Sequence, residues 1–325
     1  MKKIHLTWIM VLTIILFTSA CGTQSPPVSS SSNSSGLPSN NVTRSSIIVG
    51  SKIDTEGGLL AQIIILMLNQ NGIQTVDKSE RGPTQIVRQA LLSGQIDMYP
   101  EYTGNGVIFF PDVDPSVWHN AQKGYEEVKT LDKERNNIIW LQPAPANNTW
   151  AIAVPQSLAA KENLKSLSDL AAYINKGGYI KLAASDEFVT SSVALPAFEK
   201  AYGFTLNQSQ LIIFSGGNTA QTEKAAADGT SGVNAAMAYG TDGSLAALDL
   251  VVLGDPLGVQ PVYEPAPVVR TAIYDQYQQM ADILNPVFQS LDLTTLQNLN
   301  GQISVQGQTN VDVAKTYLKS RGFLK

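Results

Sequence analysis

The chain has 325 residues, of which 43% are hydrophobic and 15% are charged, and its net charge is -5. That length is sufficient for two globular domains with cores of their own. The mild acidity argues against a nucleic-acid partner, because nucleic acids select basic surfaces. The single cysteine cannot form an internal disulfide, so the fold must depend on its core.

The first residues have the pattern of an export signal. Lys2 and Lys3 precede an apolar run at 6–17 that is too short to span a bilayer. We therefore expect residues 1–20 to be a signal peptide.

The segment Thr18-Ser19-Ala20-Cys21 looks like a bacterial lipoprotein cleavage site, although Thr18 stands where an aliphatic residue is usual. In that interpretation Cys21 becomes the lipidated first residue. The alternative is an ordinary secretory signal with a chance cysteine. Residues 21–46 are mostly Ser, Asn, Pro, Gly and Thr, which predicts a flexible tether to a lipid anchor on the outer face of the cytoplasmic membrane.

The folded part begins with alternating strands and helices. Apolar runs predict strands, and apolar residues at helical spacing, bounded by Thr84, Gly72 and Gly94, predict the helices between them. The expected strands are 47–49, 73–76 and 96–99, and the expected helices are 60–68 and 84–91. This order favours a parallel, doubly wound sheet, whose ligands sit beyond the carboxyl ends of the strands.

The same alternation resumes later in the chain. A charged helical stretch at 112–135 and a strand at 138–141 come first, followed by a proline-marked crossing and the strand 151–154. Ser166 or Ser168 is expected to cap the next helix, and Thr219 a later one. Further strands are expected at 180–183, 211–214, 235–239, 250–253 and 266–270, and further helices at 191–202, 272–284, 291–299 and 311–319.

This order predicts an α/β protein with two lobes and a ligand cleft between them. The expected first lobe is discontinuous, with residues 47–149 and 254–325, and the second lobe, residues 150–253, is inserted into it. The two crossings near Trp150 and Val252 would act as hinges.

Catalytic motifs are scarce in the sequence. The two histidines are His5, in the leader, and His119, on a polar stretch, and the sequence has no G-x-S-x-G elbow, no P-loop and no G-x-G-x-x-G motif. A metal site rich in His or Cys is excluded by the same composition. We therefore expect a protein that is not an enzyme, with no cofactor and no metal, although a carboxylate-based hydrolase stays open.

Four aromatic residues stand at strand ends or in Pro/Gly-rich loops, outside any periodic apolar face. They are Tyr102, Trp150, Tyr239 and Tyr263. Any one of these rings could simply plug the edge of a core. If all four meet in one cleft, they can enclose a positively charged ligand that donates few hydrogen bonds.

The motifs around these rings resemble those of substrate-binding proteins of ABC importers for glycine betaine, choline and related osmoprotectants. The resemblance covers residues 47 to 325 and lies in five motifs that occur in family order. They are Gly50-Ser51-Lys52 with Thr55-Glu56, Glu101-Tyr102-Thr103-Gly104, Asn147-Asn148-Thr149-Trp150, Tyr239-Gly240-Thr241-Asp242-Gly243, and Tyr263 with Ala266 to Arg270.

The resemblance implies a periplasmic-binding-protein-like fold of type II and an aromatic cage around a quaternary ammonium group. It assigns the cage to Tyr102, Trp150, Tyr239 and Tyr263, with tryptophan at 150 where the family commonly has tyrosine. It also implies an ABC permease with its ATPase as partner, and we expect the binding protein to be a monomer.

One position departs from the family. Members that bind betaine often carry an arginine where Ser191 follows Glu187-Phe188, and that arginine can grip the ligand carboxylate. Either betaine binds weakly here, or the ligand differs, or Asn105, Asn148 or a basic residue compensates. The basic candidates are Lys52, Arg81 and Arg270.

The function expected from the sequence is capture of a quaternary ammonium osmoprotectant and its delivery to a permease on lobe closure. The alternatives are a binding protein of the same fold for another small zwitterion such as an amino acid, an exported hydrolase, and a sensory lobe coupled to a receptor.

Overall fold

The computed structural model describes residues 46–325, which fall within one compact unit. The predicted signal peptide, Cys21 and the predicted tether apart from Ser46 lie outside the described residues. Within the described part of the chain, no helix combines the length and the apolar character needed to cross a bilayer.

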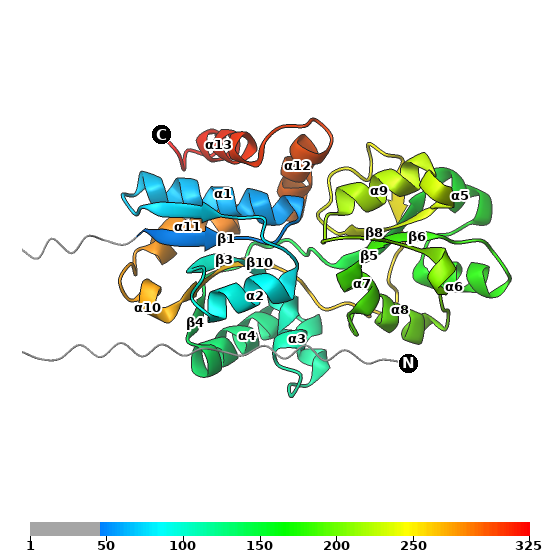
Figure 1. Cartoon of the computed structure of the whole chain (residues 1–325), viewed down its shortest axis with the longest axis horizontal. Coiled ribbons are helices and arrows are strands. Elements are labelled where there is room, and N and C mark those ends of the chain that lie inside the picture. The colour runs from blue at the N-terminus through cyan, green and yellow to red at the C-terminus, as the bar shows by residue number, and fades with distance from the viewer. Residues whose placement is uncertain (1–45) are drawn as a thin grey trace, which may run out of the picture. The chain divides into compact units, whose positions relative to one another are not determined.

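The described chain forms two five-stranded sheets, A and B (Figure 1). In spatial order, the strands of sheet A are β2 (Thr75–Lys78), β1 (Ile47–Gly50), β3 (Met98–Tyr102), β10 (Pro265–Arg270) and β4 (Ile138–Trp140). Strand β1 is parallel to β2 and β3, as the alternating pattern predicted. Strand β10 runs antiparallel to both of its neighbours, so the sheet is mixed.

Helices cover both faces of sheet A (Figure 1). One face carries α1 (Thr55–Gln70), α11 (Met280–Gln289), α12 (Leu293–Ser304) and α13 (Asn310–Ser320). The other carries α2 (Thr84–Leu92), α3 (Gly106–Phe109), η2 (Pro115–His119) and α4 (Ala121–Asn136), while α10 (Thr271–Tyr274) follows β10. Neighbouring residues of β10 belong to opposite cores, Val268 to one and Val269 to the other, as the two-residue period of a strand requires.

All strands of sheet B lie between β4 and β10 in the sequence. In spatial order they are β7 (Leu211–Phe214), β6 (Leu182–Ser185), β8 (Ala235–Tyr239), β5 (Trp150–Pro155) and β9 (Leu250–Val252). Strand β6 is parallel to β7 and β8, whereas β5 is antiparallel to β8 and β9.

Sheet B is also packed on both faces. Ile152 and Val154 of β5 belong to the core shared with α5 (Gln156–Glu162), α6 (Leu167–Asn175), α7 (Asp186–Thr190) and α8 (Leu195–Tyr202). The intervening Ala153 belongs to the core under α9 (Thr219–Asp228), together with alanines of β6 and β8. These small side chains let α9 lie close to the sheet. The predicted α/β class is thus confirmed.

Several expected boundaries were wrong by a few residues. Ser166 caps α6 in a capping box, as one of the two expected candidates, but the N-caps of α2 and α9 are Pro83 and Asn218 instead of the threonines that follow them. Strand β3 continues to Tyr102, because antiparallel pairing with β10 extends it beyond the apolar run that the sequence pattern detects. Tyr102 is therefore held in a ladder and does not stand on a free loop.

Candidate functional site

The four predicted aromatic residues line one cavity. Its empty space, which includes solvent at the open mouth, is about 440 Å³. The lining residues come from the ends of strands in both sheets and from the loops that follow β1, β2 and β7. They are Lys52, Ile53, Asp54, Gly82, Pro83, Thr84, Tyr102, Asn105, Asn148, Trp150, Glu187, Gly217, Tyr239 and Tyr263.

Strand pairing places these rings. Trp150, the first residue of β5, is the direct antiparallel partner of Tyr239, the last residue of β8. In sheet A, Tyr102 pairs with Pro265, so Tyr263 lies two residues beyond the end of that ladder. Each sheet therefore contributes one pair of aromatic residues.

The two pairs meet in space. The ring centroids of Trp150 and Tyr263 are 5.7 Å apart with an interplanar angle of 54°, and Trp150 also makes an edge contact with Phe188 of α7 at 6.1 Å. A Cβ on Gly104 would come within 2.7 Å of the Tyr263 ring, so only glycine lets this ring lie against the turn after β3. Tight packing of this kind fixes ring orientation before a ligand arrives.

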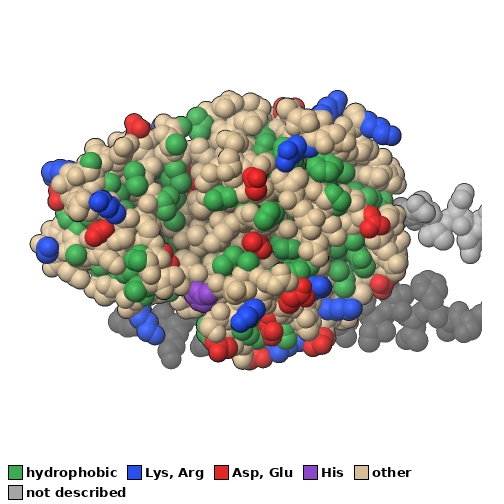
Figure 2. All heavy atoms as spheres, turned by 180° about the vertical axis from the view of Figure 1, so that it is seen from behind, with side chains coloured by type: hydrophobic (Ala, Val, Ile, Leu, Met, Phe, Trp, Pro, Cys, Tyr) green, Lys and Arg blue, Asp and Glu red, His purple; other side chains and the backbone are tan. Residues whose placement is uncertain are grey.

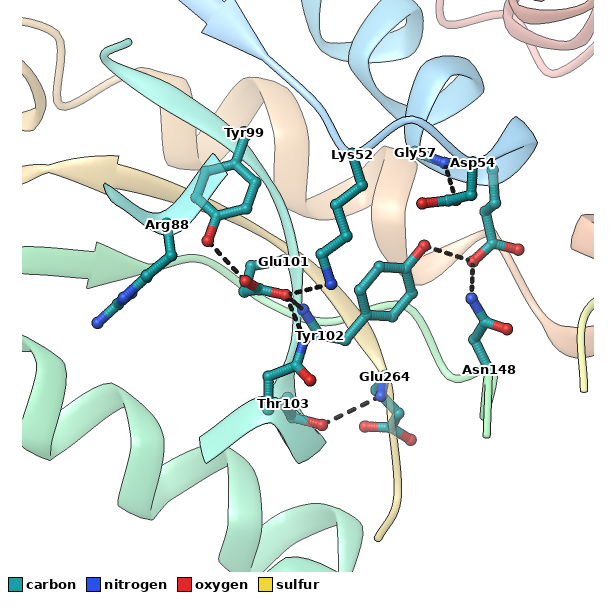
Figure 3. Close-up of polar contacts among 12 residues, drawn as sticks. Lys52, Asp54, Gly57, Arg88, Tyr99, Glu101, Tyr102, Thr103, Asn148 and Glu264 are labelled. Atoms are coloured by element: carbon teal, nitrogen blue, oxygen red, sulfur yellow. Dashed lines mark hydrogen bonds and ion pairs between the residues drawn. The ribbon is translucent and has the colours of Figure 1, made fainter. Parts of the chain in front are cut away.

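Lys52 brings a positive charge into the cavity wall. Its Nζ lies 2.8 Å from Glu101 Oε1 and 4.5 Å from the centroid of the Tyr102 ring (Figure 3). The ammonium therefore already covers one face of that ring by a cation–π contact.

Glu101 organises this corner of the site although its side chain is fully buried. Its Oε1 also accepts hydrogen bonds from the Tyr102 backbone N–H and from Asn105 Nδ2, both at 2.7 Å, and its Oε2 accepts one from the Tyr99 hydroxyl at 2.6 Å. Several donors to one carboxylate offset the cost of burying its charge. Asn105, a predicted ligand residue, is thus held at the cavity by its donation to Glu101.

Two further carboxylates line the cavity, Asp54 and Glu187. Asp54 is the N-cap of α1 and accepts a 2.7 Å hydrogen bond from the Gly57 N–H. Burial raises the pKa of Asp54, against the opposing effects of nearby Lys52 and of that hydrogen bond. Asp54 therefore caps α1 and also lines the cavity.

Asn148 lines the cavity and donates through Nδ2 to Glu56 Oε1 at 3.1 Å. The Tyr102 hydroxyl donates to the same oxygen at 3.0 Å. Figure 3 shows the Tyr102 hydroxyl and the Asn148 amide converging on one carboxylate. Burial and the negative charges of Glu56 and Asp54 keep the pKa of Tyr102 well above its ordinary value, so its hydroxyl stays protonated and donates.

Three residues considered from the sequence are not among those lining the cavity. Ser191 ends α7, and its hydroxyl is buried without a hydrogen-bond partner; Glu187, from the same helix, lines the cavity instead. Arg270 forms an ion pair with Asp97, at the end of β10 away from Tyr263, and Arg81 donates to the Lys78 carbonyl. Of the three basic candidates, the structure therefore brings Lys52 alone to the cavity.

Two potential donors at the cavity have no hydrogen-bond partner of normal geometry among the described residues. They are the indole N–H of Trp150, which lies near the Tyr239 hydroxyl, and the hydroxyl of Tyr263, both in buried side chains. An unpaired buried donor costs free energy unless a ligand or water satisfies it. These atoms are therefore suited to hold an acceptor.

Glu187 lines the cavity but was not predicted from the sequence as a ligand residue. Glu187 directly precedes Phe188, and the family's arginine position lies four residues after Glu187, at Ser191. Glu187 and Ser191, the C-cap of α7, are about one helical turn apart, and of the two Glu187 lines the cavity.

The cavity chemistry is that of binding by rings and a few fixed charges. In the described part of the chain, no group of three or more His, Cys, Asp and Glu side chains is arranged to hold a metal ion. Acidic and basic side chains are interspersed on the surface shown in Figure 2, without a large patch of one sign.

Comparisons with known proteins agree with this geometry. Residues 45–320 match the OpuAC family, described as the substrate binding domain of the ABC-type glycine betaine transport system. The chain is 59% identical over 281 residues to the glycine betaine-binding protein YehZ of Escherichia coli K12, covering 86% of this chain and 92% of that protein.

Solved structures show the same fold. Apo YehZ from E. coli aligns with a TM-score of 0.64 at 59% identity, covering 86% of this chain and 99% of that one. A structure titled glycine betaine/carnitine/choline ABC transporter aligns with a TM-score of 0.67 at 20% identity, covering 86% and 100%. The expected type II periplasmic-binding-protein-like fold is thus confirmed, and proteins of this kind bind substrates for a transporter and are not enzymes. The chain belongs to the family of substrate-binding domains of ABC-type glycine betaine transport systems.

Proposed function

We propose that this protein captures glycine betaine or a related quaternary amine outside the cytoplasmic membrane and delivers it to an ABC permease. The observation that carries the proposal is the meeting of Tyr102, Trp150, Tyr239 and Tyr263 in the lining of one cavity. The name of the E. coli relative supports glycine betaine as the first ligand to test.

The aromatic walls suit the head group of such a ligand. A trimethylammonium group donates no conventional hydrogen bond, so ring faces and dispersion must hold it. Each cation–π contact contributes about 0.5–2 kcal/mol, and a micromolar ligand needs about 8 kcal/mol. Four ring contacts therefore reach the energy needed for micromolar binding only if each lies at the upper end of its range. The tail of the ligand must contribute the rest.

Lys52 is the best-placed partner for a ligand carboxylate. Its ammonium lines the cavity and lies over one face of Tyr102, so a second cation is repelled from that side. We therefore orient the ligand with its carboxylate toward Lys52 and its head group toward Trp150, Tyr239 and Tyr263, with Tyr102 offering its other face. The unpaired hydroxyl of Tyr263 supplies a further donor for polar atoms of the ligand.

Ligand capture would be coupled to closure of two lobes. We propose that residues 47–149 and 254–325 form the first lobe and residues 150–253 the second, with hinges where the chain crosses between the sheets. The supporting observation is that sheet A contributes Tyr102 and sheet B contributes Trp150 and Tyr239 to one cavity. A ligand that contacts both sheets favours the arrangement that buries it.

The cellular setting extends the proposal. Cys21 would carry the lipid that anchors the protein, residues 21–46 would be its tether, and the closed monomer would dock on the permease whose ATPase drives uptake. Labelling of cells with a tagged fatty acid tests the anchor. The label should be lost in Cys21→Ser, and label retained in that variant would contradict lipidation.

Isothermal titration calorimetry with glycine betaine, choline, carnitine and proline betaine tests the ligand class. We expect heat from at least one of them and cage variants that weaken it. No binding across the whole panel at millimolar ligand would overturn the proposal.

A second candidate ligand class is another small zwitterion, such as an amino acid. The observation that favours it is the presence of Asp54 and Glu187 in the cavity wall, because a carboxylate can accept hydrogen bonds from a primary ammonium group. Competition by tetramethylammonium separates the two classes, since it offers a head group without donors. Displacement of the ligand by tetramethylammonium supports a quaternary amine.

A further inference from the structure

Glu56 lies behind the cavity as a buried hub. It is the second residue of α1, only 4% exposed, and it is not one of the lining residues. Its carboxylate accepts hydrogen bonds from the Tyr102 hydroxyl at 3.0 Å, Asn148 Nδ2 at 3.1 Å and Asn300 Nδ2 at 2.7 Å. A buried carboxylate with these donors ties together the elements that supply them.

Two of these donors are connected directly to aromatic residues that line the cavity. Tyr102 is itself one of these residues. The segment containing Asn148 is bound to Tyr263, because the Asn148 N–H donates to the Tyr263 carbonyl and the Tyr263 N–H donates to Asn147 Oδ1, both at 2.8 Å. Asn148 also lies two residues before Trp150.

The third donor, Asn300, is connected to the segment that carries the fourth aromatic residue, Tyr239. Asn300 Nδ2 donates to the Thr241 carbonyl at 3.0 Å as well as to Glu56, and Thr241 lies two residues after Tyr239. The Thr241 hydroxyl lies near the Glu56 carboxyl, although it forms no hydrogen bond of normal geometry. Glu56 is therefore within two hydrogen bonds of the chain segments that carry all four rings.

We propose that Glu56 is a positioning residue that holds the four aromatic walls in their binding arrangement, and that only its ionised form does so. This inference rests on the proposed function. Nothing in the family match or in the names of the relatives assigns a role to this carboxyl.

The hydrogen-bond pattern explains why the ionised form is needed. Each partner donates to Glu56, so a protonated Glu56 must find an acceptor. The oxygens near Glu56 that could accept this proton are the hydroxyls of Tyr102 and Thr241 and the amide oxygens Asn148 Oδ1 and Asn300 Oδ1. The Thr241 hydroxyl and both amide oxygens lack hydrogen-bond partners. Turning an amide to accept the proton withdraws its NH₂ group, and for Asn300 it also breaks the link to Thr241.

Glu56 is able to change its charge near neutrality. Burial raises the pKa of Glu56 from 4.5 to about 7, and the negative charge of Asp54 adds to the shift. Asp54 at the start of α1 and Tyr102 from β3 are the titratable groups that face it, with Lys52 farther off and paired with Glu101. The groups from the other elements packed against it, Asn148, Asn300 and Thr241, are neutral.

A cation in the neighbouring cavity favours the ionised form of Glu56, so ligand binding and loss of the proton are linked. If only the ionised form binds, affinity falls by about tenfold for each pH unit below the pKa, because the competent fraction falls by that factor. The inference thus predicts an affinity for a quaternary amine that rises with pH and levels off above neutrality.

Calorimetric titration of glycine betaine and choline into wild type, Glu56→Gln and the control Glu134→Gln, at several pH values between about 5.5 and 8, tests this. Glu134 is an exposed carboxylate of α4. We expect Glu56→Gln to bind about tenfold more weakly at pH 8 and to lose the pH dependence, and Glu134→Gln to match wild type. Wild-type affinity or retained pH dependence in Glu56→Gln would overturn the inference while leaving the proposed function intact.

Failure of the proposed function is recognised separately, because wild type then binds no ligand of the panel. The hub is in that case tested without ligand by the infrared difference spectrum between wild type and Glu56→Gln. A protonated-carboxyl band that grows as pH falls through neutrality is expected, and its absence would contradict the inference. If Glu56→Gln does not fold, Asn300→Ala serves instead: it removes one donor to the carboxylate and should move the midpoint to higher pH, whereas an unmoved midpoint would contradict the hub.

Discussion

The rings of Trp150 and Tyr263 lie 5.7 Å apart, although Trp150 begins a strand of sheet B and Tyr263 precedes a strand of sheet A. This contact joins the aromatic pair of one sheet to the pair of the other. A ligand enclosed by both rings would therefore touch both halves of the described chain.

Replacement of Trp150 by Ala tests that contact directly. Loss of one cation–π wall should weaken binding of a quaternary amine by about 1–2 kcal/mol, or roughly tenfold. Trp150→Phe keeps a smaller ring face and should lose less. Calorimetry checks both variants, with Tyr179→Ala as control because Tyr179 is an exposed aromatic residue far from the lining set. Equal affinities for Trp150→Ala and wild type would remove Trp150 from the cage.

The ring positions show what the sequence could and could not predict. Strand ends and Pro/Gly-rich loops are visible as local patterns, so the α/β class and the four aromatic positions were predictable. The antiparallel pairing of β10 with β3 was not, because it joins segments far apart in the chain, and it is this pairing that extends β3 to Tyr102.

The charged part of the site was harder to predict. Lys52 was one of three basic candidates in the sequence, and the structure shows it both paired with Glu101 and lining the cavity. Asn300, which completes the buried network at Glu56, lies in α12 and carried no signal at all, since a single asparagine in a helix is usually exposed. Its role depends on tertiary contact alone.

Lys52→Met should weaken binding of a ligand with a carboxylate and not binding of a ligand without one. Glycine betaine loses its proposed partner and should bind at least tenfold more weakly, since a charged hydrogen bond contributes about 1.5–3 kcal/mol. Choline has no carboxylate and should bind as in wild type or more tightly, because a repelling cation is removed. The ratio of the two affinities, measured by calorimetry, is the readout, and Lys176→Met at an exposed site is the control. A parallel loss for both ligands would indicate that Lys52 acts through the packing of Glu101 instead.

Gly243→Ala should disturb the contact between the loop after β8 and α12. A Cβ at Gly243 would lie 2.1 Å from the Gln297 carbonyl oxygen and 2.3 Å from the Gly301 nitrogen, and backbone atoms of a helix cannot move aside cheaply. Next to this contact, the Gln297 side chain donates a hydrogen bond to the carbonyl of Gly240, the residue that follows Tyr239. We expect weaker ligand binding with little change in helix content by circular dichroism. Gly229→Ala is not a suitable control because its φ is positive, whereas Gly124→Ala meets nothing closer than 3.6 Å and should bind normally.

The buried ion pair of Arg88 and Asp132 should matter for stability and not for ligand specificity. Asp132 also accepts a 2.6 Å hydrogen bond from the Trp140 indole, and both charged side chains are almost fully buried. Asp132→Ala leaves a buried guanidinium unpaired and should lower the free energy of unfolding by about 3–5 kcal/mol. Arg135→Ala removes the exposed pair with Asp112 and should change it by less than about 1 kcal/mol. Urea unfolding at neutral pH compares them, and similar losses in the two variants would contradict this account.

Stability should fall as pH rises from mildly acidic to neutral. Burial raises the pKa of Glu56 from 4.5 to about 7, and it also raises the pKa values of Asp54 and of the buried Glu223 and Asp242, so the folded state binds more protons than the unfolded state in this window. Stability then decreases with pH between the unfolded and folded pKa values and levels off above them. For Glu56 alone the shift corresponds to about 3 kcal/mol.

Thermal unfolding in a series of buffers from about pH 4.5 to pH 8 measures this slope, with unfolding free energies from urea at the two ends. Glu56→Gln cannot titrate at this position, so its unfolding free energy should depend less on pH, by most of the amount assigned to Glu56. The stability of the variant relative to wild type should therefore increase as pH rises. The exposed Asp292 caps α12 with a lowered pKa, so it adds stability only above the acidic range, and Asp292→Asn should leave the slope above pH 5 unchanged. A wild-type stability that rises steadily from pH 5 to pH 8 would show that these carboxyls are not buried as described.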